Sequence, residues 1–194
     1  MSRPILYVVR HGETDWNREG RLQGQRDIPL NELGRAQAAE AACRLQALVA
    51  RPEALDYVAS PMERTRETME LLRGALGLDP ARYRTDPRLV ELTFGEWEGR
   101  TWREVRKADP DRASARERNK WGYVPPGGES YAGLAARTRP FLEEVARDTV
   151  VVAHGGVARV FLAIACGVSN RHAASLDIWQ GRVLVIRPSR FEWA

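Results

Sequence analysis

Cysteine is scarce in this sequence and does not occur in pairs. Of the 194 residues only Cys43 and Cys166 are cysteine, and each lies in an apolar stretch with helical spacing. Disulfide frameworks and zinc sites need more cysteines at closer spacing. We therefore expect two free, buried thiols in a reducing compartment, and we place the protein in the cytoplasm.

Long apolar runs are also missing. The apolar run near the N-terminus, Ile5–Val9, is too short for the core of a signal peptide or for a membrane span. A hydrophobic content of 43% and a charged content of 29% are ordinary for a globular protein, and the length fits a single domain over residues 1–194. We expect no membrane partner.

Lysine is nearly absent, because only Lys107 and Lys120 are lysine among 30 basic residues. The formal net charge is +4, but the arginines are interleaved with Asp and Glu and form no basic block. No nucleic-acid-binding module is recognisable, so we expect no nucleic-acid partner. A few clustered arginines would instead suit a small anionic substrate.

Several catalytic motifs are missing as well. There is no Gly-x4-Gly-Lys-Ser/Thr loop and no Gly-x-Gly-x-x-Gly loop. Neither cysteine is followed six residues later by the arginine of a cysteine-phosphatase loop. With three histidines and no His-x-x-Glu-His, a zinc site would have too few ligands, so we expect no metal. The remaining candidates for catalytic groups are histidine, arginine and carboxylate side chains.

What the sequence does contain is two apolar runs that end in His-Gly. Leu6–Val9 is followed by Arg10 and His11, and Thr149–Ala153 is followed by His154. Both runs predict short buried strands, and ligands bind at the carboxyl ends of strands in an open α/β sheet. A lone buried histidine is more often a packed core residue, but two at equivalent strand ends favour a site. We interpret His11 as a nucleophile for phosphorus.

A third predicted strand is followed closely by a positively charged residue, Arg64. Leu55–Ala59 predicts a strand, and Ser60, followed by Pro and then by Glu two residues later, predicts a helix capped by the serine. Arg64 would then lie in the first helical turn, on the same rim as His11. The alternative is a surface arginine that pairs with Glu67.

A carboxylate candidate lies in the segment from Glu91 to Glu98, which holds three glutamates among apolar and aromatic residues. A carboxyl beside Leu89, Leu92 and Phe94 would be partly desolvated. Desolvation favours the protonated form and suits a general acid near neutrality. It is equally open that Glu91 caps a turn or pairs with an arginine.

Two later segments have an expected structural role. Residues 100–130 leave the strand–helix alternation, and we predict that they form a cap-like excursion over the site. Their charged and aromatic side chains are candidates for substrate selection, although a solvated surface explains them equally well. Ser175–Trp179, Gln180-Gly181 and Arg182–Arg187 predict a hairpin that adds an antiparallel strand at the edge of the sheet.

In this order the motifs resemble the histidine phosphatase superfamily, the phosphoglycerate mutase-like proteins. The resemblance covers nearly the whole chain. It implies an α/β fold, a three-layer α/β/α sandwich with a mostly parallel central sheet and an antiparallel edge strand. The segments that carry it are Arg10-His11-Gly12-Glu13-Thr14 with Asn17, Gln23-Gly24, Ser60-Pro61 with Arg64, Glu91 with Phe94–Gly99, Gly128-Glu129-Ser130 and Ala153-His154-Gly155-Gly156.

The resemblance also implies roles for the site residues. His11 would attack phosphorus and become phosphohistidine, while Arg10, Arg64 and His154 hold the charge of the transferring group. Glu91 would protonate the departing alkoxide and then activate the water that releases phosphate. The further residues expected to bind phosphate or substrate are Asn17, Gln23, Gly24 and Gly155.

Two activities fit this resemblance. One is a metal-independent phosphomonoester hydrolase that needs no cofactor and acts on a small phosphorylated metabolite. The other is a phosphoglycerate mutase that uses 2,3-bisphosphoglycerate. The mutases that the chain resembles carry a longer insertion between Glu91 and His154, so we favour the phosphatase branch. A non-catalytic phospho-ligand-binding module is disfavoured because every residue the chemistry needs is present. The substrate and the oligomeric state, a homodimer included, stay open.

Overall fold

A six-stranded mixed sheet forms the centre of the computed structural model, which describes residues 4–194. The strand order is β3-β2-β4-β1-β5-β6. β1, β2, β3 and β4 pair in parallel, β5 is antiparallel to β1, and β6 is antiparallel to β5. The strands are β1 Leu6–Arg10, β2 Asp56–Ala59, β3 Arg84–Thr85, β4 Thr149–Ala153, β5 Leu184–Arg187 and β6 Arg190–Trp193.

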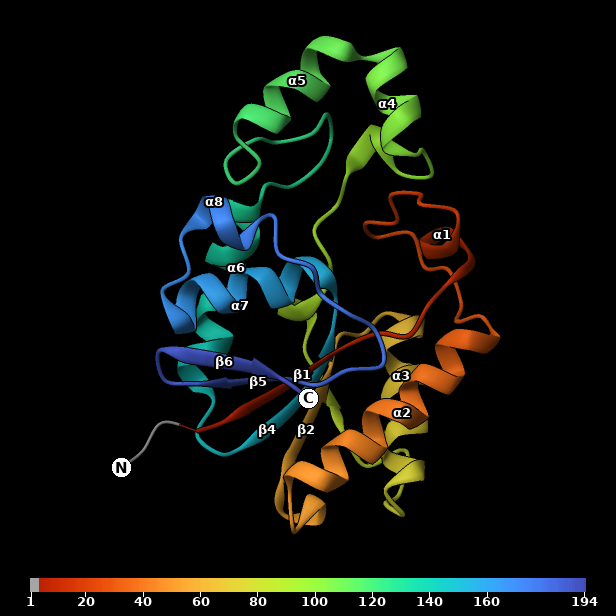
Figure 1. Ribbon diagram of the computed structural model, residues 1–194, viewed down its shortest axis with the longest axis vertical. Helices are drawn as coiled ribbons and strands as arrows, with labels where there is room; N and C mark the ends of the chain where they lie inside the picture. Colours follow the sequence, from red (N-terminus) through yellow and green to blue (C-terminus); the bar gives the residue numbers. More distant parts are fainter. Residues whose placement is uncertain (1–3) are drawn as a thin grey trace.

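Helices cover both faces of this sheet, which confirms the expected three-layer sandwich (Figure 1). α2 and α3 pack together on one face, and α6 and α7 pack together on the other. Within residues 4–194, no helix is both long enough and apolar enough to span a bilayer. The helices are α1 Asp15–Arg18, α2 Glu32–Leu48, α3 Glu63–Ala75, α4 Trp102–Ala108, α5 Pro110–Arg118, α6 Tyr131–Glu144, α7 Gly155–Cys166 and α8 Asn170–Ala173, with 3-10 turns at Pro52–Ala54, Pro87–Leu89 and Gly95–Trp97.

Side chains of the central strands pack in two separate hydrophobic cores, one on each face of the sheet. Successive side chains of a strand point to opposite faces of its sheet. Accordingly Val8 packs in the core under α6 and α7, whereas Val9 packs in the core under α2 and α3. Every residue of β4 is buried, as expected for a strand with neighbours on both sides and helices on both faces.

The register between β1 and β4 brings the two His-Gly segments together. Arg10 lies opposite Ala153, and the His11 N–H continues the ladder by donating to the Ala153 carbonyl at 3.0 Å. Because β1 and β4 are parallel neighbours, the residues that follow them leave the sheet at the same edge. His11 and His154 are therefore adjacent, as the sequence predicts.

The predicted C-terminal hairpin is misplaced. Ser175–Trp179 is not a strand; the hairpin consists of β5 and β6, which turn at Pro188-Ser189. β5 pairs with β1 because its apolar side chains pack in both cores of the sheet. In Ser175–Trp179, by contrast, the Ile178 carbonyl accepts a hydrogen bond from the Arg10 guanidinium. The antiparallel edge therefore contains two strands instead of one.

The prediction of buried thiols is also wrong. Cys43 is exposed and Cys166 is only partly buried. The buried face of α2 is formed by small residues and Leu45, and Cys43 lies outside that face. Both cysteines are free.

α4 and α5 lie apart from the two helical layers (Figure 1). They pack on a small apolar cluster of their own, formed by Leu22, Trp97, Val105 and Ala113. The Leu22 N–H donates to the Arg100 carbonyl at 2.9 Å. This contact ties the 13–29 loop to the start of the 100–130 segment.

Candidate active site

His11 is held as a neutral imidazole with one free ring nitrogen. The side chain is 4% exposed, and its Nδ1 lies 2.8 Å from the Gly12 carbonyl oxygen. A carbonyl can only accept, so Nδ1 carries the proton and donates. The lone pair is therefore on Nε2, the atom that can attack. Burial, with the charges of Arg64 and Arg10, lowers the pKa of His11 well below its ordinary value.

His154 is fully buried beside it, with the two ring centroids 5.3 Å apart in an edge-on arrangement. Its Nε2 lies 2.9 Å from Ser60 Oγ, and its Nδ1 lies 3.4 Å from Arg64 Nη2. A guanidinium can only donate, so Nδ1 accepts and Nε2 donates to Ser60. Burial and the nearby Arg64 lower the pKa of His154 well below its ordinary value.

Ser60 therefore does not cap α3 as predicted. The N-cap of α3 is Met62, and it makes no side-chain capping bond. The Glu63 N–H finds its acceptor in Asp27 Oδ2 at 2.7 Å. The local capping rule is overridden because the Ser60 hydroxyl faces the buried His154 ring.

Arg64 is 1% exposed and is fixed by backbone carbonyls. Nη1 donates to the Arg26 carbonyl at 2.7 Å, and Nη2 donates to the Gly24 carbonyl at 2.9 Å. The Nε–H is buried and has no hydrogen-bond partner within the described residues. Gly24 thus contacts the Arg64 guanidinium through its carbonyl. Glu67, the alternative partner considered for Arg64, contacts Arg35 instead.

Arg10 is arranged in the same way. Its Nη1 donates to the Ile178 carbonyl at 2.9 Å, whereas its buried Nε–H is another group without a partner in residues 4–194. Burial, together with the charge of Arg159, lowers the pKa of Arg10 to about 10. A Cβ added to Gly155 would stand 3.8 Å from Arg10 Nε, so this donor lies at the N-terminus of α7.

Of the three glutamates in the segment from Glu91 to Glu98, Glu91 is the one that contacts the N-terminus of α7. Its Oε2 accepts from the Gly156 N–H at 3.0 Å, and its Oε1 accepts from the Leu92 N–H at 2.9 Å. A Cβ on Gly156 would lie 2.2 Å from Oε1, so a side chain there would displace the Glu91 carboxylate. Glu96 is exposed, and Glu98 bonds to the loop around it.

Asn17 lies in the short helix α1, and Gln23 lies in the loop that follows it. Asn17 Oδ1 accepts from Gln180 Nε2 at 3.1 Å and from the Thr14 N–H at 3.3 Å, which directs its amide N–H₂ elsewhere. Gln23 Nε2 donates to Thr14 Oγ1 at 2.7 Å, while Gln23 Oε1 is buried and, in the described part of the chain, unpartnered. Both side chains are fixed by Thr14, the N-cap of α1.

Three residues near this site, Ser60, Gln180 and Arg159, are not among the predicted site residues. In the sequence Ser60 fits a helix cap, and Gln180, which donates to the His11 carbonyl at 3.0 Å, fits a turn. Arg159 lies one helical turn after Gly155, and its Nη1 is 3.3 Å from the point where a Gly155 Cβ would stand. A lone cation in the apolar Val157–Ile164 run was the signal that could have revealed it.

The arrangement suits a phosphoryl group. A neutral imidazole offers its lone pair, two buried guanidinium N–H groups have no acceptor in the described part of the chain, and a helix N-terminus favours an anion. A carboxylate stands at the same helix end. Across residues 4–194, no group of three or more His, Cys, Asp or Glu side chains is placed to hold a metal ion.

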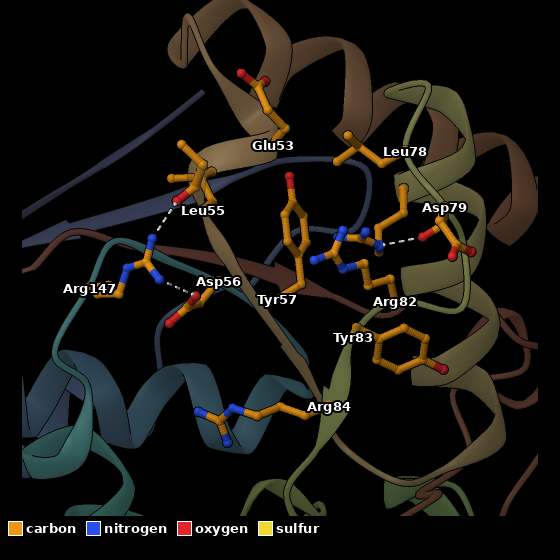
Figure 2. A pocket seen from close by; sticks show the side chains of 12 residues that line it. Glu53, Leu55, Asp56, Tyr57, Leu78, Asp79, Arg82, Tyr83, Arg84 and Arg147 are labelled. Carbon is orange, nitrogen blue, oxygen red and sulfur yellow. Dashed lines mark hydrogen bonds and ion pairs between the residues drawn. The ribbon is translucent and has the colours of Figure 1, made fainter.

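A cavity of about 720 Å³ elsewhere has a different character (Figure 2). It lies by Asp56, at the start of β2, whereas Ser60 follows the other end of that strand. Two of its arginines are already paired: Arg147 lies 3.6 Å from Asp56, and Arg73 Nε donates to the Asp79 carbonyl at 2.8 Å. No histidine lines it.

Comparison with known proteins identifies the family. Residues 6–194 match the sequence profile of the histidine phosphatase superfamily (branch 1), so the chain belongs to this family. The resemblance inferred from the motifs is thereby confirmed.

The relatives include phosphatases and mutases. A glucosyl-3-phosphoglycerate phosphatase of Mycobacterium tuberculosis is 37% identical over 165 residues, covering 78% of this chain and 70% of the relative. A 2,3-bisphosphoglycerate-dependent phosphoglycerate mutase of Nitrobacter winogradskyi is 30% identical over 195 residues, covering 96% and 93%. The structure of a mycobacterial glucosyl-3-phosphoglycerate phosphatase superimposes with a TM-score of 0.79 at 29% identity, covering 98% and 96%.

Proposed function

We propose that the protein is a metal-independent phosphomonoester hydrolase that acts on a small phosphorylated metabolite through a phosphohistidine on His11. The observation that carries the proposal is the pair of buried, neutral imidazoles near Arg10 and Arg64, each of which has a buried Nε–H without an acceptor among residues 4–194. An anion with several oxygens would satisfy those donors and place phosphorus against His11 Nε2. The mycobacterial phosphatase relative supports a metabolite phosphate as substrate.

The reaction runs in two balanced steps. In the first, the Nε2 lone pair of His11 forms a bond to phosphorus, the ester P–O bond breaks, and Glu91 gives its proton to the departing alkoxide. In the second, Glu91 takes a proton from water as the water oxygen bonds to phosphorus. The P–N bond then breaks, and its electron pair returns to His11. Arg10 and Arg64 stabilise the charge on the transferring oxygens throughout.

Hydrolysis of p-nitrophenyl phosphate in the presence of a chelator tests the proposal. We expect turnover that persists with chelator and disappears in His11→Ala, whereas His172→Ala, at an exposed histidine, keeps it. Radiolabelled substrate quenched during turnover should leave an acid-labile label in the wild-type chain. Phosphate binding without turnover on a broad ester panel would contradict hydrolysis and support a binding module.

A second candidate is the mutase reaction. The Nitrobacter relative named as a mutase matches nearly the full length of both chains and favours it. A mutase returns the phosphoryl group to its substrate and must keep water from the intermediate. Conversion of 3-phosphoglycerate to 2-phosphoglycerate that depends on added 2,3-bisphosphoglycerate, and exceeds phosphate release, would establish this candidate instead.

A further inference from the structure

The cavity at the start of β2 is separate from the candidate active site (Figure 2). Its volume of about 720 Å³ falls within the range of roughly 300–1,000 Å³ that is typical of small-molecule sites. Its wall is formed by the turn before β2, the C-terminal part of α3 and the segment that leads into β3. Ser60, which contacts the His154 ring, follows the opposite end of β2. A ligand in this cavity would therefore not contact the phosphoryl-transfer residues.

Arg73 brings a buried positive charge to this cavity. It lies in the last turn of α3 and is 5% exposed. Its Cζ lies 4.3 Å from the centroid of the Tyr57 ring, and its Nε donates to the Asp79 carbonyl at 2.8 Å. These two contacts fix the guanidinium, but neither Nη atom has a hydrogen-bond or ion-pair partner within residues 4–194. Both Nη groups can therefore donate to an acceptor that enters the cavity.

Arg82 adds a second positive charge to the same cavity. It lies in the segment between α3 and β3. In the described part of the chain its guanidinium forms no hydrogen bond and no ion pair. Burial lowers the pKa of Arg73, and the charge of Arg82 lowers it further, because the two like charges repel each other. An anion bound between them would relieve this repulsion.

The two other arginines of the cavity are balanced by carboxylates. Arg147 lies 3.6 Å from Asp56, and Arg84 lies 3.7 Å from Asp86. In Figure 2, Arg147 and Asp56 lie on the other side of the β2 strand from Tyr57, as expected because successive side chains of a strand point to opposite faces. The positive charge that lacks a carboxylate partner is therefore on the Tyr57 side of the cavity.

Two exposed carboxylates also line the cavity, and each has a contact of its own. Glu53 Oε1 lies 3.1 Å from Arg51 Nε, and Asp79 Oδ1 accepts from the Ala81 N–H at 3.0 Å. Water and salt screen exposed charges more strongly than buried ones. These carboxylates therefore oppose the binding of an anion less than the buried guanidinium of Arg73 favours it.

We propose that this cavity is a second anion site, in which Arg73 and Arg82 bind a phosphate group, either free phosphate or the phosphate of a small ester. A phosphate monoester carries a charge of about −2 at neutral pH, which two guanidinium groups balance. Its several oxygens suit the free Nη donors, since charge-assisted hydrogen bonds to guanidinium groups are strong. The site uses no residue of the candidate active site, so it does not depend on the proposed function.

Titration of the ¹⁵N-labelled protein with inorganic phosphate tests this site. Backbone amide signals report each site separately, and constant ionic strength, kept with sodium chloride, removes the general effect of salt. We expect the signals of residues 79–84 to shift and saturate, independently of those from the candidate active site. Shifts of the same size with sodium chloride alone would contradict a phosphate site.

Substitutions of the two arginines measure their contribution. Arg73→Met and Arg82→Met should each weaken the phosphate binding seen at residues 79–84 by on the order of tenfold, the scale of a charge-assisted hydrogen bond. Methionine keeps an unbranched apolar side chain while removing the charge. Arg118→Met, which removes an exposed cation from α5, is the matched control and should bind phosphate as the wild type does.

A titration with glucose 6-phosphate distinguishes the two sources of the phosphate group. His11→Ala serves as the protein here, because the ester must stay intact during the measurement. Tighter binding of glucose 6-phosphate than of inorganic phosphate at residues 79–84 identifies a phosphate ester as the ligand. Weaker binding identifies free phosphate, and both results support the site.

Three outcomes would overturn the inference. Phosphate that shifts only the signals of the candidate active site would exclude the second site and leave the hydrolase proposal unaffected. Wild-type affinity in Arg82→Met would show that the arginine pair does not hold the anion; because Arg82 is exposed, this variant decides the test even where Arg73→Met does not fold. A lower melting temperature of Arg73→Met with unchanged phosphate affinity would show that Arg73 only stabilises the end of α3.

Discussion

Ser60 Oγ lies 2.9 Å from Nε2 of His154, and this contact holds the imidazole in one orientation. On the other side of the ring, Arg64 Nη2 lies 3.4 Å from Nδ1. A guanidinium can only donate, so Nδ1 accepts and Nε2 donates to the Ser60 hydroxyl. Ser60 is thus a positioning residue that supports one tautomer of His154.

Replacing Ser60 with alanine should leave the Nε2–H of His154 without its acceptor. We expect kcat for Ser60→Ala to fall by about tenfold, the scale of one buried hydrogen bond. Ser175→Ala, at an exposed serine, serves as the control. The ¹⁵N shifts of the His154 ring report its tautomer. If these shifts are the same in Ser60→Ala as in the wild type, Ser60 does not hold the tautomer.

Glu91→Gln should separate substrates by their leaving groups. Glutamine keeps the shape but cannot supply a proton. We expect on the order of 100-fold slower hydrolysis of alkyl phosphates, and a much smaller effect on p-nitrophenyl phosphate, whose phenolate needs little protonation. Glu96→Gln, at an exposed glutamate of the same segment, should behave as wild type. Equal slowing of both substrates would remove Glu91 from the acid role.

Arg64→Lys should be damaging although it conserves charge. Two of the guanidinium nitrogens donate to backbone carbonyls, and the Nε–H has no acceptor within residues 4–194, a division that a single ammonium cannot reproduce. We expect kcat/KM to fall by about 100-fold. Arg66→Lys, an exposed change on α3, is the matched control. Full activity in Arg64→Lys would show that the fork is not needed.

The two buried histidines should make stability depend on pH. In the unfolded chain a histidine titrates near pH 6.5. The folded state keeps both rings neutral below that pH, because burial and nearby arginines lower the pKa of His11 and of His154. Below pH 6.5 the unfolded state therefore binds more protons. The stabilisation is fully present above pH 6.5 and is lost as pH falls toward the depressed pKa values of the folded state.

Urea unfolding in phosphate-free buffer from pH 7.5 to pH 5.5 measures this effect. The limiting slope is about 1.4 kcal/mol per pH unit for each histidine. In His11→Asn the change of unfolding free energy with pH should fall by the contribution of one histidine. His172→Asn, at the exposed histidine, should keep the wild-type slope. Parallel curves for wild type and His11→Asn would show that His11 titrates normally.

The sequence predicted the parts of the fold that depend on local burial. The short β-branched apolar runs before His11 and His154 predict strands, and parallel pairing then brings their ends together. The parts it mispredicted depend on tertiary contacts. Ser60 fits a capping motif, but its hydroxyl faces a buried imidazole. Ser175–Trp179 alternates like a strand, but Leu184–Arg187 is the segment that pairs with β1. Arg159 required knowledge of which face of α7 meets the site.

The His11 carbonyl accepts from Gln180, 169 positions further along the chain, and the Arg10 guanidinium reaches Ile178. Bringing such distant positions together costs loop-closure entropy, which makes these contacts slow to form. During synthesis His11 is made long before Gln180, so the end of β1 gains this support only after Gln180 has emerged from the ribosome. Until then the setting of the His11 imidazole is incomplete.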